Sequence, residues 1–507
     1  MSESQAVESQ AVDTRVPRSH WIILILILAL GAFLRFYGLA HQPIWLDEAL
    51  TIHVAKMDPA EMIDWLKIDV HPPLFYFLLH GWMKLFGSGE AAVRALPALF
   101  GFLLLPALYW VGAALFGRRA GLLAALAAAV SVFHARFSQE VRMYTLLPLL
   151  GLLSLYFLYK AVLENKIRYW IGYGLLMTAT LYTHNYGAFI AAAGVVFFII
   201  IALGQKLNWV KFLIVNGLVG LAFLPWLPVV LGRQLGNPSL VGWIPRMRLV
   251  HVFQTFGSYV GLPIHLFRPG LNTAILIVGA AAFLVCFAAG IFTLRMRGRL
   301  TVPYIPNQAG LVLVLCYLVV TLGLPMLISV WKPILLPFRY SIAAWPAFVL
   351  LLGNGLAKFK KTGVRLTILA LVLAVSSASL YWYHFRWVKS HDREIAAFIE
   401  SNAGPKDVIV YAPDVIDLPI KYYLRFPRKS VGYVPRENAP EKTLAQAKAM
   451  MKPPRSRLFL VCDTAMTWVP QLNELQRLFD VSFQRVKRKD FYPMRITVYA
   501  RKRSDAL

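Results

Sequence analysis

Long apolar runs separated by short polar stretches dominate the first 385 residues of this chain. The runs are close to 20 residues long, about the length an α-helix needs to cross the hydrocarbon core of a bilayer. The pattern predicts a polytopic α-helical membrane protein with about eleven spans. We expect them near residues 21–39, 91–115, 120–135, 143–162, 168–183, 186–204, 211–231, 271–293, 309–331, 337–356 and 363–384.

The loops between these runs differ in charge. Every second loop is short and basic, which is typical of loops on the cytoplasmic side. We therefore expect residues 1–19 to be a cytoplasmic polar tail and residues 20–385 to be the membrane domain. With an odd number of spans, the C-terminal segment lies on the outer side. The basic loop residues are Arg118, Arg119, Lys166, Arg168, Lys206, Lys211, Arg295, Arg297, Arg299, Lys358, Lys360, Lys361 and Arg365.

Residues 386–507 have the composition of a soluble domain. A helix-like run at His391–Ser401 is followed by a strand-like run at Asp407–Tyr411, and the same alternation recurs further on. Such a pattern predicts a small α/β domain. Its other predicted elements are Leu458–Cys462, Pro470–Phe479 and Ile496–Ala500.

Composition excludes several classes of protein. The chain has 507 residues, 58% hydrophobic and 15% charged, with a mean hydropathy of +0.59. Soluble proteins carry about 25% charged residues, so an ordinary cytosolic enzyme is excluded. Three Cys residues exclude a disulfide-stapled module, and their spacing shows no zinc-thiolate motif. The net charge of +27 fits a membrane protein better than a nucleic-acid binder.

The carboxylates concentrate in one part of the membrane domain. The predicted first outer loop, residues 40–90, holds seven of them, whereas residues 165–391 have none. Acid–base chemistry by a carboxylate in the membrane domain must therefore use the first third of the chain.

Three motifs on the outer side carry candidate chemistry, and the first is WLDEALT at residues 45–51. Asp47 and Glu48 are adjacent acids at the membrane surface, where one of two close carboxylates usually has a raised pKa. That setting suits a general base near neutral pH. The alternative is that Asp47 only caps the following helix.

The second motif is DVHPPL at residues 69–74. The proline pair marks a helix start, because proline is tolerated in the first turn. Asp69 and His71 would then lie at a helix N-terminus, which favours an anion such as phosphate. A plain turn with a cap is the alternative.

The third motif is HARFSQEVRMY at residues 134–144. Arg136 and Glu140 are four residues apart, as are His134 and Ser138, so each pair could share a helical face. Arg142 belongs to the same motif. An Arg–Glu pair that only locks two helices together is the alternative.

Basic and aromatic side chains at other outer helix ends complete the candidate set. His184 follows one span, and Arg339 and Tyr340 precede a late one. A planar guanidinium suits two-point binding of phosphate oxygens. The alternatives are a structural histidine and an arginine that snorkels to the interface.

In this order and on one side of the membrane, the motifs resemble one family over roughly residues 20–385. It is the polytopic GT-C glycosyltransferases, specifically the group of protein O-mannosyltransferases and aminoarabinose transferases (glycosyltransferase family 39, with the RgtA-like domain). The resemblance implies a GT-C fold with Asp47 as catalytic base and Glu48 beside it. It also implies donor or acceptor contacts for Asp69, His71, Arg136, Glu140 and Arg142, and a place near the lipid phosphate for Arg339 and Tyr340.

The chain departs from the eukaryotic mannosyltransferases because it has no β-trefoil domain. A protein acceptor is therefore no more favoured than a lipid or glycan. The resemblance and the outer cations together predict an inverting transfer from a polyprenyl monophosphate sugar to an acceptor hydroxyl. No nucleotide, nucleic acid or obligate metal is implied, although a divalent metal held by Asp69, His71 or His184 is an alternative.

A transporter or lipid-linked sugar flippase is the rival class. It would place charged or broken helices near the bilayer midplane. Most motif residues lie at outer helix ends instead, which favours chemistry at the membrane surface. A cytosolic tail with an outer soluble domain fits a multi-pass protein of a bacterial inner membrane.

Overall fold

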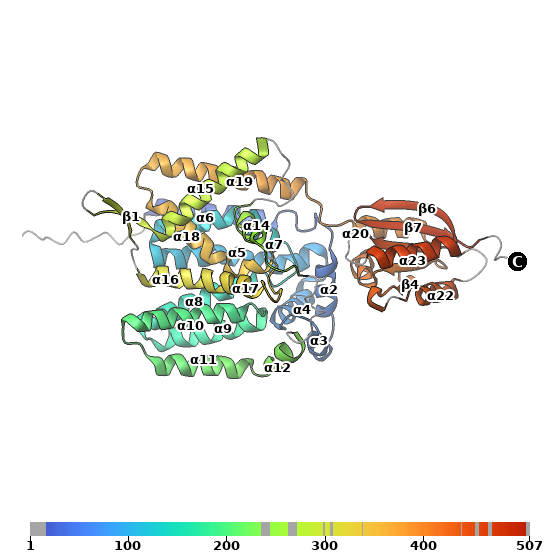
Figure 1. The fold of residues 1–507 in the computed structure, drawn as a ribbon, viewed down its shortest axis with the longest axis horizontal. Coiled ribbons are helices and arrows are strands. Elements are labelled where there is room, and N and C mark those ends of the chain that lie inside the picture. The colour runs from blue at the N-terminus through green and yellow to red at the C-terminus, as the bar shows by residue number, and fades with distance from the viewer. Residues whose placement is uncertain are drawn as a thin grey trace, which may run out of the picture.

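The computed structural model describes the chain from residue 17 to residue 502 with several gaps. A bundle of apolar helices forms one part, and a small domain with a five-stranded sheet forms the other (Figure 1). The described residues are 17–234, 244–261, 271–297, 300–304, 308–336, 338–437, 439–451, 456–464 and 469–502.

Seven helices among the described residues are long and apolar enough to cross a membrane. Each coincides with an apolar run predicted from the sequence. They are α1 (Arg18–Phe36), α5 (Glu90–Phe116), α8 (Leu146–Glu164), α10 (Gly187–Gly204), the α16–α17 segment (Ala309–Ile328), the α18 segment (Tyr340–Lys358) and α19 (Thr362–Phe385).

The other four predicted runs correspond to helices outside this set of seven. They are α9 (Ile167–Thr183), α11 (Trp209–Phe223), α15 (Leu271–Ile291) and a pair, α6 (Arg118–Ala129) and α7 (Val132–Ser138), bent by 62°. Ser131 begins α7 by accepting a hydrogen bond from the His134 amide. Buried Arg35 of α1 donates to the carbonyls of Ala128 and Ala129 where α6 ends. These bonds give partners to carbonyl groups at the end of α6, where the regular helical hydrogen bonds stop.

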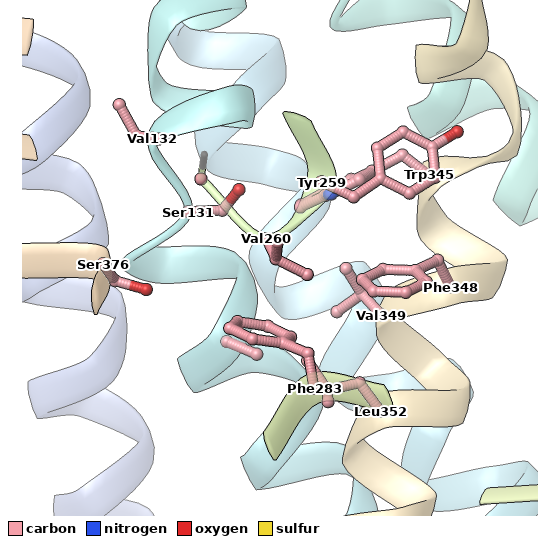
Figure 2. Close-up of a pocket in the computed structure, with 12 residues that line it drawn as sticks. Ser131, Val132, Tyr259, Val260, Phe283, Trp345, Phe348, Val349, Leu352 and Ser376 are labelled. Carbon is pink, nitrogen blue, oxygen red and sulfur yellow. The ribbon is translucent and has the colours of Figure 1, made fainter. Parts of the chain in front are cut away.

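A cavity of about 10 Å³ lies beside this break (Figure 2). Ser131 and Ser376 supply its polar wall, and Trp345 and Phe348 of α18 lie on the apolar side. That volume is about what one water molecule requires.

The predicted first outer loop folds into α2 (Leu46–Ala55), α3 (Pro59–Leu66) and α4 (Leu74–Phe86). These helices lie at the end of the bundle that bears the C-terminal domain, whereas the β1–β2 hairpin (Thr293–Arg297, Leu300–Tyr304) lies at the opposite end (Figure 1). The remaining helical pieces of the membrane part are α12 (Leu227–Val229), the π-helix η1 (Val230–Gln234) and α14 (Leu249–Tyr259).

The C-terminal domain is α/β, as predicted. Its sheet has the order β4–β3–β5–β7–β6, in which β3 runs parallel to β4 and β5, while β7 is antiparallel to β5 and β6. Both faces of β3 are buried, because α20 and α21 pack on one side and α22 and α23 on the other. The elements are α20 (Asp392–Asn402), β3 (Val408–Ala412), α21 (Asp417–Tyr423), β4 (Lys429–Gly432), α22 (Pro440–Met450), β5 (Leu458–Asp463), α23 (Val469–Ser482), β6 (Gln484–Phe491) and β7 (Met494–Ala500).

Close approach of α15 and α18 depends on glycine, and this gives a first prediction. A Cβ atom on Gly355 would overlap the carbonyl oxygen of Cys286 in α15. We expect Gly355→Ala to lower the free energy of unfolding by about 1–3 kcal/mol, the usual effect of overpacking, measured by thermal unfolding in detergent. Gly363→Ala is the control, because no atom of the described residues lies within 4 Å of a Cβ there. Equal stability of the two variants would contradict this packing.

Candidate active site

The first turn of α2 carries Asp47, which pairs with Arg339 from a segment 292 residues later. Arg339 Nη1 donates to Asp47 Oδ2 at 2.7 Å, and the side chains are 15% and 26% exposed, respectively. Trp45 occupies the N-cap position of α2 and Asp47 lies inside its first turn, so Asp47 does not have the capping role that the sequence left open. The pair joins the first and third thirds of the chain at a position that solvent reaches.

Trp45, directly before α2, forms an aromatic wall beside this pair. The Arg339 guanidinium lies 5.1 Å from the indole ring centre, and the Lys389 ammonium lies 5.3 Å from it. Both distances are within the range of cation–π attraction.

Glu48 is fully buried and holds a different network. Arg94 of α5 donates to both of its carboxylate oxygens, at 2.8 and 2.7 Å. The Val141 amide and the Lys389 ammonium also donate to it, each at 3.0 Å. Burial raises the pKa of Glu48, but Lys389 and Arg94 more than offset this and lower it to about 2.

These contacts correct the expectation that Glu48 is catalytic together with Asp47. A carboxylate with no exposure and cations on both oxygens neither reaches a substrate nor accepts its proton. The two acids also do not share a proton, because each has its own arginine.

The DVHPPL motif forms a series of polar contacts near Asp47. The proline pair directly precedes α4, as predicted. His71 Nδ1 lies 3.0 Å from Asp69 Oδ2, and Arg142 Nη2 lies 3.0 Å from His71 Nε2. Burial, followed by the charge of Arg142, lowers the pKa of His71 more than Asp69 raises it. The geometry therefore fits a neutral imidazole that donates from Nδ1 to Asp69 and accepts at Nε2 from Arg142.

Arg142 also connects these contacts to α2. Its Nη1 donates to the Thr51 hydroxyl at 2.9 Å, and that hydroxyl donates to the Asp47 carbonyl at 2.7 Å. Arg142 thereby ties α2 to the DVHPPL segment.

His184 and Tyr340 form the adjoining wall. The His184 ring meets the rings of His71 and Tyr340 at centroid distances of 5.4 and 5.5 Å. The Tyr186 amide donates to His184 Nδ1 at 3.1 Å, which leaves the ring proton on Nε2. Burial, with the charge of Arg142, places the pKa of His184 well below its ordinary value.

The prediction that Arg136 and Glu140 share a helical face is wrong. Helix α7 ends at Ser138, so Glu140 lies in the following turn and not on the helix. Glu140 Oε2 is 3.7 Å from the Lys389 ammonium, whereas Arg136 stacks on Trp387 at 4.9 Å. The His134–Ser138 spacing does fall on α7, and there the Ser138 hydroxyl donates to the His134 carbonyl.

Several buried polar atoms around the Asp47–Arg339 pair have no hydrogen-bond partner in the part of the chain that the structure describes. They include His184 Nε2, the Tyr144 hydroxyl and Glu140 Oε1. Native proteins satisfy most such groups, so a cluster of unsatisfied ones indicates a place for a ligand. Its members are two donors and one acceptor.

Within the described ranges, no three His, Cys, Asp or Glu side chains come together in a group that could hold a metal ion. Asp69, His71 and His184, which the sequence left open as metal ligands, are instead engaged by one another, Arg142 and the Tyr186 amide.

The sequence did not reveal three residues of this site: Trp45, Arg94 and Lys389. Arg94 carried a usable signal, because a charge inside a long apolar helix is expensive and normally functional. Lys389 carried none, since it lies in a polar stretch with many other basic residues.

Comparison with known families supports the resemblance. Residues 70–231 match the family model described as dolichyl-phosphate-mannose-protein mannosyltransferase. This match covers the DVHPPL motif from Val70 onward, the third motif and His184. No curated protein sequence matches the chain.

Solved structures share the fold across almost the whole chain. ArnT from Cupriavidus metallidurans, solved with bound undecaprenyl phosphate, is 13% identical with a TM-score of 0.62, and the match covers 95% of this chain and 98% of ArnT. The oligosaccharyltransferase AglB from Archaeoglobus fulgidus, solved with an inhibitory peptide and a dolichol-phosphate, is 12% identical with a TM-score of 0.54. That match covers 96% of this chain and 75% of AglB. At such identities the likeness concerns the fold.

The fold and the family match together indicate a polytopic membrane glycosyltransferase of the GT-C class. Within that class, residues 70–231 are similar to the dolichyl-phosphate-mannose-protein mannosyltransferases, and the fold is similar to that of ArnT. The transporter alternative is thereby set aside.

Proposed function

We propose that this enzyme transfers a sugar from a polyprenyl monophosphate to an acceptor hydroxyl, with inversion at the anomeric carbon, at the membrane end that holds α2 and α4. The observation that carries the proposal is the partly exposed Asp47–Arg339 pair next to unpaired buried donors. A carboxylate that reaches solvent beside groups suited to an anion is what a base and a leaving phosphate require.

The donor phosphate would lie between Arg339 and His184. Arg339 offers further N–H donors besides the one on Asp47, and His184 offers an unpaired Nε2–H. Tyr144 adds a hydroxyl, and Tyr340 lines the same wall. Arg142 contributes positive charge but is held by Thr51 and His71, so its role is to position α2 and the DVHPPL segment. Arg136 stacks on Trp387 and is not one of these proposed phosphate-binding residues.

In the reaction, the acceptor oxygen forms a bond to the anomeric carbon while the bond from that carbon to the phosphate oxygen breaks. Asp47 takes the proton of the acceptor hydroxyl. The bonding electron pair leaves with the polyprenyl phosphate, whose growing charge Arg339 and His184 stabilise. Glu140 Oε1, an unpaired acceptor, is placed to bind a hydroxyl of the sugar or of the acceptor.

The two ends of the bundle support an outer-face site in an inner membrane. Lys166 and Lys361, at helix ends away from α2–α4, belong to the loops that the positive-inside rule assigns to the cytoplasm. The site and the C-terminal domain lie at the other end (Figure 1).

Binding of undecaprenyl phosphate to the purified chain in mild detergent tests the donor site. We expect retention visible by native mass spectrometry, with the uncharged alcohol undecaprenol bound at least about 10-fold more weakly, since charge-assisted hydrogen bonds are worth about 1.5–3 kcal/mol. Arg339→Gln and His184→Ala should each weaken phosphate binding by a similar factor.

Lys361→Gln is the control, because this exposed lysine directly precedes α19, whose other end leads to the C-terminal domain. Equal binding of the phosphate and the alcohol, or no effect of Arg339→Gln, would contradict the donor site.

A further inference from the structure

The linker between the last membrane helix and the C-terminal domain, residues 386–391, passes through the site. The side-chain amide of Gln42, which lies just before α2, bonds the backbone of this linker through both its nitrogen and its oxygen. The Gln42 side-chain nitrogen donates to the Trp387 carbonyl at 2.7 Å, and the Lys389 amide donates to Gln42 Oε1 at 2.9 Å. A two-point bond of this kind fixes the register of the linker against the first outer loop.

This register delivers the Lys389 ammonium into a buried cluster of charges. Its Nζ lies 3.0 Å from Glu48 Oε2 and 3.7 Å from Glu140 Oε2, and the side chain is 7% exposed. Together with Arg94, the cluster has two carboxylates and two cations. Without the lysine, buried Glu48 would keep Arg94 but lose its second cation, and buried Glu140 would lose the ammonium 3.7 Å away, which is unfavourable for buried charges.

The C-terminal domain contacts α5 one helical turn before Arg94. Arg393 of α20 donates to both oxygens of Glu90, at 2.7 and 2.9 Å, and the Tyr423 hydroxyl of α21 donates to the same carboxylate. Glu90 begins α5, and Arg94 follows it by one turn on that helix. The domain and the Glu48 cluster are therefore held by adjacent turns of one rigid element.

We propose that Lys389 is a positioning residue of the transferase, through which the linker to the C-terminal domain sets the active-site geometry. On one side it holds Glu48, whose neighbour is Asp47. On the other it holds Glu140, two residues before Arg142, the residue that connects α2 with His71. Lys389 thus fixes α2 and the 139–145 turn relative to each other. The catalytic part of this inference rests on the proposed function.

Lys389→Met and Lys389→Arg in the full-length protein test this role. Turnover is measured with a panel of undecaprenyl monophosphate sugars and a total membrane extract as acceptor. For Lys389→Met we expect kcat to fall about 100-fold, the effect of an ångström-scale misplacement, with the donor KM little changed. Lys389→Arg should recover most of kcat, because it keeps the charge. Lys442→Met, an exposed lysine on α22, is the matched control and should behave as wild type.

A second measurement does not require turnover. Hydrogen exchange of the Val141 amide, which donates to Glu48, should become about 10-fold faster or more in Lys389→Met when the cluster loosens. Exchange within α8 should stay unchanged. Gln42→Ala, which frees the linker but keeps the lysine, should show the same changes in kcat and exchange at smaller size.

The proposal is overturned if Lys389→Met keeps kcat and Val141 exchange at wild-type values. It is also overturned if Lys389→Arg loses as much kcat as Lys389→Met while Val141 exchange stays normal, since the amine would then act in the chemistry itself. If Lys389→Met does not fold, wild-type kcat and exchange in Gln42→Ala overturn it. If wild-type enzyme transfers no sugar from the panel, the proposed function fails, and the exchange data alone decide whether Lys389 holds the two segments together.

Discussion

Asp47→Asn should reduce sugar transfer by about 10²–10⁴-fold, the usual contribution of a general base. Asparagine keeps the size and one hydrogen-bond acceptor toward Arg339 but takes no proton from the acceptor hydroxyl. Stability should change by less than about 1 kcal/mol, because the Asp47–Arg339 pair is partly exposed. Undecaprenyl phosphate should bind as well as before or better, since Arg339 loses a competing carboxylate.

Asp64→Asn is the matched control, a carboxylate of the same loop with 75% of its side chain exposed. It should transfer sugar at the wild-type rate. Near wild-type turnover in Asp47→Asn would move the base to another carboxylate, of which Glu140 is the nearest candidate by its unpaired oxygen. A large loss of donor binding would instead make Asp47 a binding residue.

Apolar periodicity predicted the helices well, because spanning helices are set by length and composition. Every predicted apolar run coincides with a helix or a helix pair. The break between α6 and α7 was not predicted, since it depends on Arg35 of another helix, which donates to the carbonyls at the end of α6. In the C-terminal domain, buried β3 and β5 were predicted, whereas the solvent-facing edge strand β6 has no apolar run to reveal it.

For the site, sequence motifs brought the right segments together but assigned partners less well. Asp47 and Arg339 were both candidates, yet nothing in the chain shows that residues 292 positions apart would pair. Glu48 and Asp47 looked equivalent as neighbours on a helix. Their roles differ because successive helical residues point about 100° apart. Asp47 therefore faces Arg339 at a partly exposed position, whereas Glu48 faces buried Arg94.

These different roles predict different effects: Asp47→Asn should lower turnover at nearly unchanged stability, whereas Glu48→Gln should lower stability. It should lower the free energy of unfolding by about 3–5 kcal/mol, the cost of removing one partner of a buried ion pair. Arg94 and Lys389 would then face a neutral amide in a site with no exposure. Thermal unfolding in detergent, followed by tryptophan fluorescence, measures the loss. Glu61→Gln is the control, because this acid of the same loop is exposed.

The effect of Glu48→Gln should also depend on pH with a defined sign. The folded pKa of Glu48 is lowered from 4.5 to about 2, so its contribution is full above pH 4.5 and declines as the pH falls toward 2. The stability difference between wild type and Glu48→Gln should therefore be constant from neutral pH down to about 5 and narrow below that. A difference that stays constant at lower pH would mean that packing, not charge, stabilises Glu48. A Glu48→Gln protein as stable as wild type but inactive would return this residue to catalysis beside Asp47.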